Sequence, residues 1–261
     1  MGLLAMLRGR RPAGGEGVEI SEQDGLRYLH LGTETVQSAM RLAEPEDLVL
    51  SYTRSMLSFL LFAPEPRRLV NVGLGGGSLA KWIYRNLPRV EQVVLEINPR
   101  VIACARQYFH LPPDGSRLRV IAADGSQWVS RHTDCTDVIV VDGYDGRAQS
   151  AELTTTDFYA DAARCMHASG MLVVNLWGND RRFDDYLKRI EGAFDGQVCC
   201  VPAAQRGNII VLAFKSRPVA TRWDELRDQA HLLQRKYGVE FPEFVEAMKR
   251  LNPHTARRLL I

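Results

Sequence analysis

The chain has 261 residues, of which 46% are hydrophobic, and its 33 basic and 31 acidic residues give a net charge of +2 at pH 7. A charge so close to zero favours no polyanionic partner, and the composition is ordinary for a globular protein. No apolar run approaches the ~20 residues that a membrane-spanning helix needs, so no membrane partner is expected.

The first sixteen residues are expected to form a flexible tail. An apolar patch at 3–7 precedes the arginines at 8–11, the reverse of the order in a secretory signal. The cysteines are five in number and form no CxxC pair. An odd count without such a pair favours free thiols in a reducing compartment. We therefore expect a cytoplasmic protein.

A small β unit with a linking helix is predicted for residues 17–62. Its strands are expected at 17–21, 26–31 and 34–39. The Asp-Gly dipeptide at 24–25 is typical of a hairpin turn. Pro45 and the two acids after it are typical of the first turn of a helix, which we expect to run on to Leu61.

From Leu69 onward, strands and helices alternate, as in a parallel sheet with right-handed crossovers. Strands are predicted at 69–72, 92–96, 118–122, 137–141 and 171–176. Helices are predicted at 78–87, 99–108, 126–131, 155–167 and 181–194. Two last strands, 197–201 and 208–214, have no helix between them and are expected to pair as an antiparallel hairpin at the sheet edge. The fold class is thus α/β, with a mostly parallel Rossmann-like sheet over 63–218 and a helical extension at 219–261.

A glycine-rich turn follows the first strand of this sheet. Residues 73–78 read Gly-Leu-Gly-Gly-Gly-Ser and open the next helix. Glycines let the backbone approach a ligand closely, and the free N–H groups of a helix N-terminus can bind it. Glu96 ends the second strand, where an acid can accept hydrogen bonds from ribose hydroxyls. These features predict a nucleoside-binding site.

Two classes of nucleoside ligand fit the turn. Residues 75–80 match the GxGxxA pattern of nicotinamide dinucleotide sites, and residues 73–77 match the GxGxG turn of adenosylmethionine-type folds. Asp124 and Asp142 end the third and fourth strands, and a dehydrogenase requires neither of them nor a terminal antiparallel hairpin. The second class is therefore favoured, although Asp124 taken alone fits a helix cap equally well.

The segment from 23 to 218 resembles the spermidine synthase (polyamine aminopropyltransferase) family. The matching pieces fall in order and are Gln37-Ser38, Tyr52, Gly75-Gly76-Gly77, Glu96-Ile97-Asn98, Asp124-Gly125, Asp142-Gly143-Tyr144-Asp145 and Phe158-Tyr159. The resemblance implies an adenosylmethionine-methyltransferase-like sheet preceded by a small N-terminal β domain. It also implies a homodimer.

The resemblance implies roles residue by residue. Asp142 is the expected catalytic carboxylate, and Asp145 helps to hold the polyamine. Tyr52 and Tyr144 are expected to contact substrate. The residues expected to bind the nucleoside donor are Gln37, Gly73, Gly75, Gly76, Gly77, Ser78, Glu96, Ile97, Asp124 and Gly125. The donor is S-adenosylmethionine or its decarboxylated form, the acceptor is an amine or another small molecule, and no metal is implied. An Asx turn is the alternative for Asp142 and Asp145.

Several positions depart from the family pattern. We place Ser78 where the family has an Asp that holds the donor's ammonium group, and a hydroxyl cannot replace a carboxylate there. Arg54 replaces the acid after the tyrosine, residues 146–149 lack the prolines of the gate loop, and Ala204-Gln205 replaces a Tyr-Pro pair. Together with Arg147 and Arg206, these changes suggest the hypothesis that the ligand carries a carboxylate.

Three functions remain open on the sequence. They are a spermidine-synthase-like transferase with a divergent site, an adenosylmethionine-dependent methyltransferase, and a non-catalytic nucleoside-binding descendant. The six histidines are scattered without ligand spacing, which argues against a metal site. The basic pairs at 249–250 and 257–258 lack interleaved aromatic residues, which argues against nucleic acid as a partner.

Overall fold

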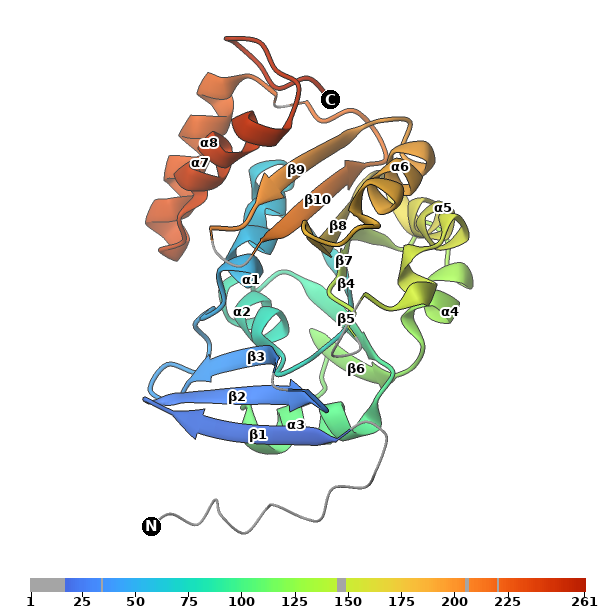
Figure 1. Ribbon diagram of the computed structural model, residues 1–261. Coiled ribbons are helices and arrows are strands. Elements are labelled where there is room, and N and C mark those ends of the chain that lie inside the picture. The colour runs from blue at the N-terminus through green and yellow to red at the C-terminus, as the bar shows by residue number, and fades with distance from the viewer. Residues whose placement is uncertain (1–16, 34, 145–148, 205–206, 220) are drawn as a thin grey trace.

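Two sheets build the protein, as the computed structural model in Figure 1 shows. The structure describes residues 17–33, 35–144, 149–204, 207–219 and 221–261. The smaller sheet has three antiparallel strands in the order β1-β2-β3, and the larger has seven in the order β6-β5-β4-β7-β8-β10-β9. The strands of the smaller sheet are β1 (Val18–Gln23), β2 (Leu26–Leu31) and β3 (Val36–Arg41).

The larger sheet is mostly parallel. Its strands are β4 (Arg68–Val72), β5 (Glu91–Glu96), β6 (Leu118–Ala122), β7 (Thr136–Val141), β8 (Met166–Trp177), β9 (Val198–Pro202) and β10 (Asn208–Phe214). Strands β4 to β8 pair in parallel, whereas β10 is antiparallel to both β8 and β9. The predicted terminal hairpin is confirmed, with β10 lying between β8 and the edge strand β9.

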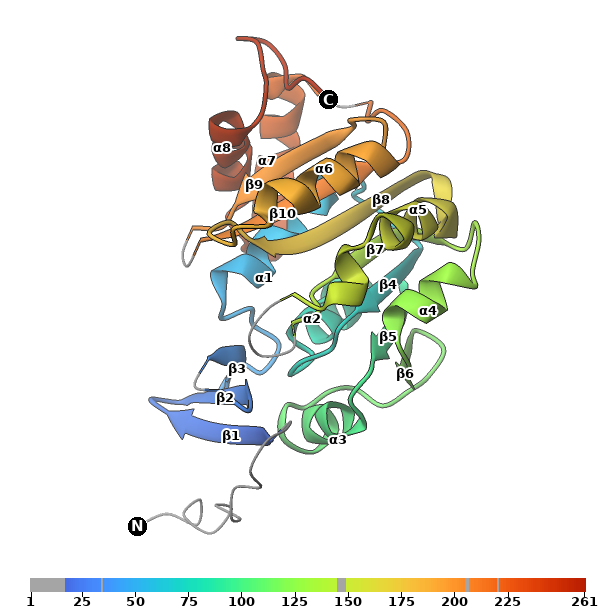
Figure 2. The same ribbon diagram turned by 45° about the vertical axis from the view of Figure 1, so that its right-hand side comes forward.

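Helices cover both faces of this sheet. They are α1 (Ser51–Met56), the 3-10 helix η2 (Leu57–Leu61), α2 (Ser78–Asn86), α3 (Pro99–Tyr108), α4 (Gly125–Ser130), the 3-10 helix η3 (Ala151–Thr154), α5 (Thr156–Cys165), α6 (Phe183–Ala193), α7 (Trp223–Tyr237) and α8 (Phe241–Leu251). Helices α4, α5 and α6 lie along one side of the sheet (Figure 2). Alternate strand residues face the two layers, as period-2 geometry requires. Among the described residues no helix is long and apolar enough to cross a membrane.

Several element boundaries differ from the sequence prediction, two of them at the ends of helices. The helix expected to begin at Pro45 begins at Ser51, and residues 45–46 form a turn. The carbonyl oxygen of Pro45 accepts a hydrogen bond of 2.7 Å from the buried Nζ of Lys81, so it does not serve a helix. The helix expected to reach residue 167 ends at Cys165, because Met166 already pairs with Thr136 at the start of β8.

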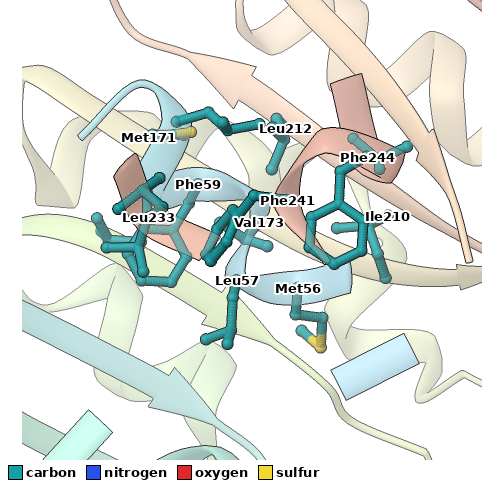
Figure 3. Packing of buried hydrophobic residues seen from close by; sticks show 14 of the residues in the cluster. Met56, Leu57, Phe59, Met171, Val173, Ile210, Leu212, Leu233, Phe241 and Phe244 are labelled. Atoms are coloured by element: carbon teal, nitrogen blue, oxygen red, sulfur yellow. The ribbon is translucent and has the colours of Figure 1, made fainter. Parts of the chain in front are cut away.

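The C-terminal helices share the core on the other face of the sheet. Leu233 of α7 and Phe241 and Phe244 of α8 pack with Phe59 of η2 and Leu212 of β10 (Figure 3). At the edge of the sheet, the Asn252 side chain accepts from the N–H of Cys200 at 2.6 Å and donates to its carbonyl oxygen at 2.7 Å. An amide that satisfies one residue of an edge strand in this way also hinders pairing with another chain.

This shared core predicts a large stability loss on truncation within α8. Replacing the fully buried Phe241 by Ala removes a ring that touches both the linking helices and the sheet. The expected cost is about 3–5 kcal/mol in the free energy of unfolding, measured by denaturant titration. Leu232→Ala is the matched control, since that side chain is 54% exposed on α7 and its loss should change stability by less than about 0.5 kcal/mol. Two separate unfolding transitions in the wild type would contradict a shared core.

Candidate active site

The glycine turn after β4 lies where several segments meet. Gly73, Gly75 and Gly77 have φ angles of 99°, 53° and 72°, in the left-handed region. A Cβ at Gly73 would collide with the carbonyl oxygen of Asp142, and one at Gly76 would lie 2.8 Å from the ring of Phe109. The turn therefore depends on glycine both for its conformation and for close packing.

Ser38 of β3 ties this turn to the small sheet. Its Oγ accepts a hydrogen bond of 2.9 Å from the N–H of Gly76, and the side chain is buried. The sequence drew attention to Ser38 only as the neighbour of Gln37. In the structure its hydroxyl oxygen is the hydrogen-bond acceptor for a buried N–H of the turn.

Glu96 bridges the turn and the next helix. Its Oε2 accepts from the N–H of Leu74 at 3.0 Å, and its Oε1 accepts from the N–H of Asn98 at 2.9 Å. Burial raises the pKa of this carboxyl above its usual value, while the backbone N–H groups act in the opposite direction. Each oxygen accepts more than one hydrogen bond. The carboxylate can therefore hold the turn and still accept from a ligand's hydroxyl groups.

The third strand end is arranged differently. Asp124 is the N-cap of α4 and accepts from the N–H groups of Ser126 and Gln127 at 2.8 and 3.3 Å. Burial acts to raise its pKa, but these hydrogen bonds outweigh it and lower the pKa. The capping alternative is thus realised, and contact with a ligand stays a prediction. Gly125 lets α4 approach Val72 closely, and the exposed Ile97 offers an apolar side chain at the same edge.

Asp142, directly after β7, has the most specific environment. The residue is half-buried and lines a recess at the end of the sheet. Its Oδ1 accepts from Nδ2 of Asn175 at 2.8 Å, and its Oδ2 accepts from the hydroxyl of Tyr52 at 3.2 Å. Burial raises its pKa, and these two donors act against that shift. Such bonds come from side chains on β8 and α1, so they are not those of an Asx turn.

Two tyrosines flank this carboxylate. Besides Asp142, the hydroxyl of Tyr52 lies 3.4 Å from the carbonyl oxygen of Gln37, the residue expected to contact the donor. The hydroxyl of Tyr144 donates to the carbonyl oxygen of Asn175 at 3.3 Å. Burial and the negative charges of Asp142 and Asp180 raise the pKa of Tyr144, so it stays protonated. Asp145, Arg147 and Arg206 lie outside the described residues.

A recess beside the glycine turn is lined by Ser38, Tyr52 and Asp142, whereas Glu96, Asp124 and Tyr144 do not line it. Among the described residues that line it, the polar ones are Ser38, Tyr52, Thr53, Asn71, Ser78 and Asp142, and none is Lys or Arg. Arg54 faces elsewhere, because its Nε donates to Glu240 at 2.7 Å and its Nη1 to the carbonyl oxygens of Leu48 and Val49. The expectation that Arg54 makes the site attract anions is therefore wrong. Its guanidinium is used to attach the linking helix to the segment before α8.

Sequence reasoning missed two amides, Asn175 and Asn208. Both lie on strands that otherwise carry apolar residues, in the runs Val-Val-Asn-Leu and Asn-Ile-Ile-Val. A polar residue inside a buried strand indicates that the fold supplies it with a hydrogen-bond partner. The partner itself could not be named, because it lies on another strand.

Comparison with known proteins places this geometry among relatives. Residues 50–223 match the family model described as spermine/spermidine synthase domain. The polyamine aminopropyltransferase of Chromobacterium violaceum is 45% identical over 244 residues, which cover 94% of each chain. That of Neisseria meningitidis is 40% identical over 241 residues, which cover 92% of each chain.

Solved structures agree on the fold. A probable spermidine synthase from Corynebacterium glutamicum has a TM-score of 0.71 at 18% identity, covering 94% of this chain and 99% of that one. A spermidine synthase in complex with the transition-state analogue AdoDATO has a TM-score of 0.63 at 19% identity, covering 89% and 85%. Human methyltransferase-like protein 13 in complex with SAH has a TM-score of 0.64 at 22% identity, covering 72% and 93%. The predicted methyltransferase-like sheet with a small N-terminal β unit is confirmed.

The contact between Ser38 and the glycine turn predicts different costs for two similar substitutions. Ser38→Ala leaves the buried N–H of Gly76 without its acceptor and should lower the free energy of unfolding by about 1–3 kcal/mol. Ser58→Ala should be neutral or stabilising, since among the described residues the buried hydroxyl of Ser58 has no hydrogen-bond partner. Denaturant titration of both variants measures the difference. Equal losses would show that the hydroxyl of Ser38 does not hold the turn.

Proposed function

Because the chain belongs to the spermine/spermidine synthase family, we propose that it transfers an aminopropyl group from decarboxylated S-adenosylmethionine to an amine acceptor, with Asp142 as the catalytic carboxylate. The observation that supports this most is the carboxylate of Asp142 beside the glycine turn, which accepts hydrogen bonds from Tyr52 and Asn175. A carboxylate with a raised pKa is suited to hold an amine and take up its proton.

The donor nucleoside is proposed to lie along the carboxyl ends of β4, β5 and β6. Glu96 would accept from the ribose hydroxyls, since its oxygens already face the turn. Ile97 would contact the adenine ring, and Asp124 and Gly125 would lie at its edge. The glycine turn would allow the sulfonium and its aminopropyl chain to approach the backbone.

The charges of the recess favour the decarboxylated donor. The recess contains the carboxylate of Asp142 and, among its described lining, no cation that could pair with a donor carboxylate. An intact donor would bring a second negative charge close to the first, whereas the ammonium group of the decarboxylated donor is attracted. This proposal differs from the hypothesis drawn from Ser78 and the three arginines, of which Arg147 and Arg206 lie outside the described residues.

Transfer is a displacement at the carbon beside the sulfonium. The acceptor nitrogen, in its unprotonated form, bonds to that carbon while the carbon–sulfur bond breaks, and the bonding pair leaves on sulfur as a neutral thioether. The new ammonium group then loses one proton to the Asp142 carboxylate. Holding the amine in line with the carbon–sulfur bond lowers the entropic part of the barrier. Asp145 is proposed to hold the second ammonium group of a diamine.

Asp142→Asn should remove the activity without removing the fold. The wild type is expected to convert decarboxylated adenosylmethionine and putrescine to spermidine and methylthioadenosine, detected by mass spectrometry. The variant cannot accept the proton, so its kcat should fall at least about 100-fold. Since burial raises the pKa of Asp142, the ionised carboxyl lowers stability above that pKa. The unfolding free energy of the variant at pH 8 should therefore equal or exceed that of the wild type. An active Asp142→Asn variant would refute the assigned role.

Calorimetric titration should separate the two donors. We expect the decarboxylated donor to bind at least about tenfold more tightly than intact adenosylmethionine, because only the latter places a carboxylate in the recess. Tighter binding of the intact form would restore the carboxylate hypothesis. Methylated product from intact adenosylmethionine would indicate a methyltransferase. The absence of binding by either donor at micromolar concentration would leave only the non-catalytic alternative.

A further inference from the structure

A chain of two amides leads away from the Asp142 carboxylate into the sheet. Nδ2 of Asn175 donates to Oδ1 of Asp142 at 2.8 Å, and Nδ2 of Asn208 donates to Oδ1 of Asn175 at 2.9 Å. Asn175 is 2% exposed and Asn208 is 7% exposed. Both amides are thus withdrawn from water. In the protein interior a hydrogen bond is electrostatically stronger than at the surface.

The strand register brings the two amides together. In the antiparallel pair, Asn175 of β8 lies opposite Ile210 of β10, and Asn208 lies opposite Trp177. Opposed residues and those two apart share a face, so Asn175 and Asn208 are diagonal neighbours on one face. The same face carries Val173 and Ile210 of the apolar core. The amides are therefore two polar residues placed together in an otherwise apolar layer.

An amide can meet a carboxylate in only one orientation. Its nitrogen donates and its oxygen accepts, while an ionised carboxylate accepts only. If Asn175 were turned over, its oxygen would face Oδ1 of Asp142 and the two would repel. Asn208 opposes that rotation, because its Nδ2 donates to Oδ1 of Asn175, and a turned amide would present its own donating nitrogen there instead.

We propose that Asn175 is a positioning residue for Asp142, and that Asn208 holds the Asn175 amide in its donating orientation. The catalytic meaning of this network rests on the proposed function, whereas its action on the Asp142 carboxyl does not. With Tyr52 on Oδ2 and Asn175 on Oδ1, the plane of the carboxylate is fixed. The network also favours the ionised form, so that the carboxylate remains available as a proton acceptor near neutral pH.

A double-mutant cycle on the pH dependence of kcat/KM tests the network. Leu has nearly the size of Asn and suits the apolar face, so Asn175→Leu, Asn208→Leu and the double variant remove the amides without leaving a large cavity. In Asn175→Leu the acidic limb of the profile should move up by about one to two pH units, because a donor to the ionised carboxyl is lost. Asn208→Leu should move it in the same direction by less. The double variant should match Asn175→Leu, since Asn208 acts only through Asn175.

The same shifts should appear without catalysis. Titration of the ¹³C-labelled aspartate carboxyls of the free protein by NMR reports the Asp142 pKa directly, and Asp142→Asn identifies its resonance. If the wild type shows no aminopropyl transfer, the proposed function fails while this titration still decides on the network. If Asn175→Leu does not fold, Asn175→Val, which also removes the donor and suits a strand, takes its place.

Asn252→Leu is the matched control. It removes a buried amide from the Cys200 backbone at the edge strand β9 and should lower stability while leaving the Asp142 titration unchanged. The proposal is overturned if folded Asn175→Leu titrates at Asp142 like the wild type. It is also overturned if Asn208→Leu has the same effect on Asp142 whether or not Asn175 is present.

Discussion

An ionised carboxylate taken out of water must be given hydrogen-bond donors, and Asp142 receives them from distant parts of the chain. Tyr52 comes from α1 and Asn175 from β8, and both reach a side chain that leaves β7. Without these donors burial would raise the pKa of this carboxyl further. The position of α1 is therefore linked to the hydrogen bond that Tyr52 donates to this carboxylate.

A second constraint acts on the glycine turn, which is held from both sides. Ser38 accepts from the N–H of Gly76, and Glu96 accepts from the N–H of Leu74. A Cβ at Gly73 would meet the backbone of Asp142. The small sheet, the end of β5 and the end of β7 are thus in contact through one short turn. A change at any of them is expected to affect the others, because the turn contacts all three directly.

The sequence predicted the fold well because the signals are local and repeat. Alternating buried strands and amphipathic helices, each bounded by turn residues, indicated a parallel sheet, and the adjacent strands at 197–201 and 208–214 indicated the hairpin. The errors lie where a distant residue decides. At Pro45, where a first helical turn was expected, the carbonyl oxygen accepts from Lys81 of α2, and the last residues expected in the helix before β8 are taken by pairing with β7. The sequence left open whether Arg54 faces the site, and the structure pairs it with Glu240 instead.

By itself, then, the sequence determined the sheet, the place of the glycine turn, and the acids that end its strands, because strand ends in a parallel sheet share one edge. Only the tertiary structure decided what each acid does there. Asp124 caps a helix, Glu96 holds the turn, and Asp142 meets Tyr52, Asn175 and, through it, Asn208. These partners lie from 33 to 90 positions away in the chain, and no local pattern specifies contacts over such separations. They follow from strand order and register, which the packing of the whole chain fixes.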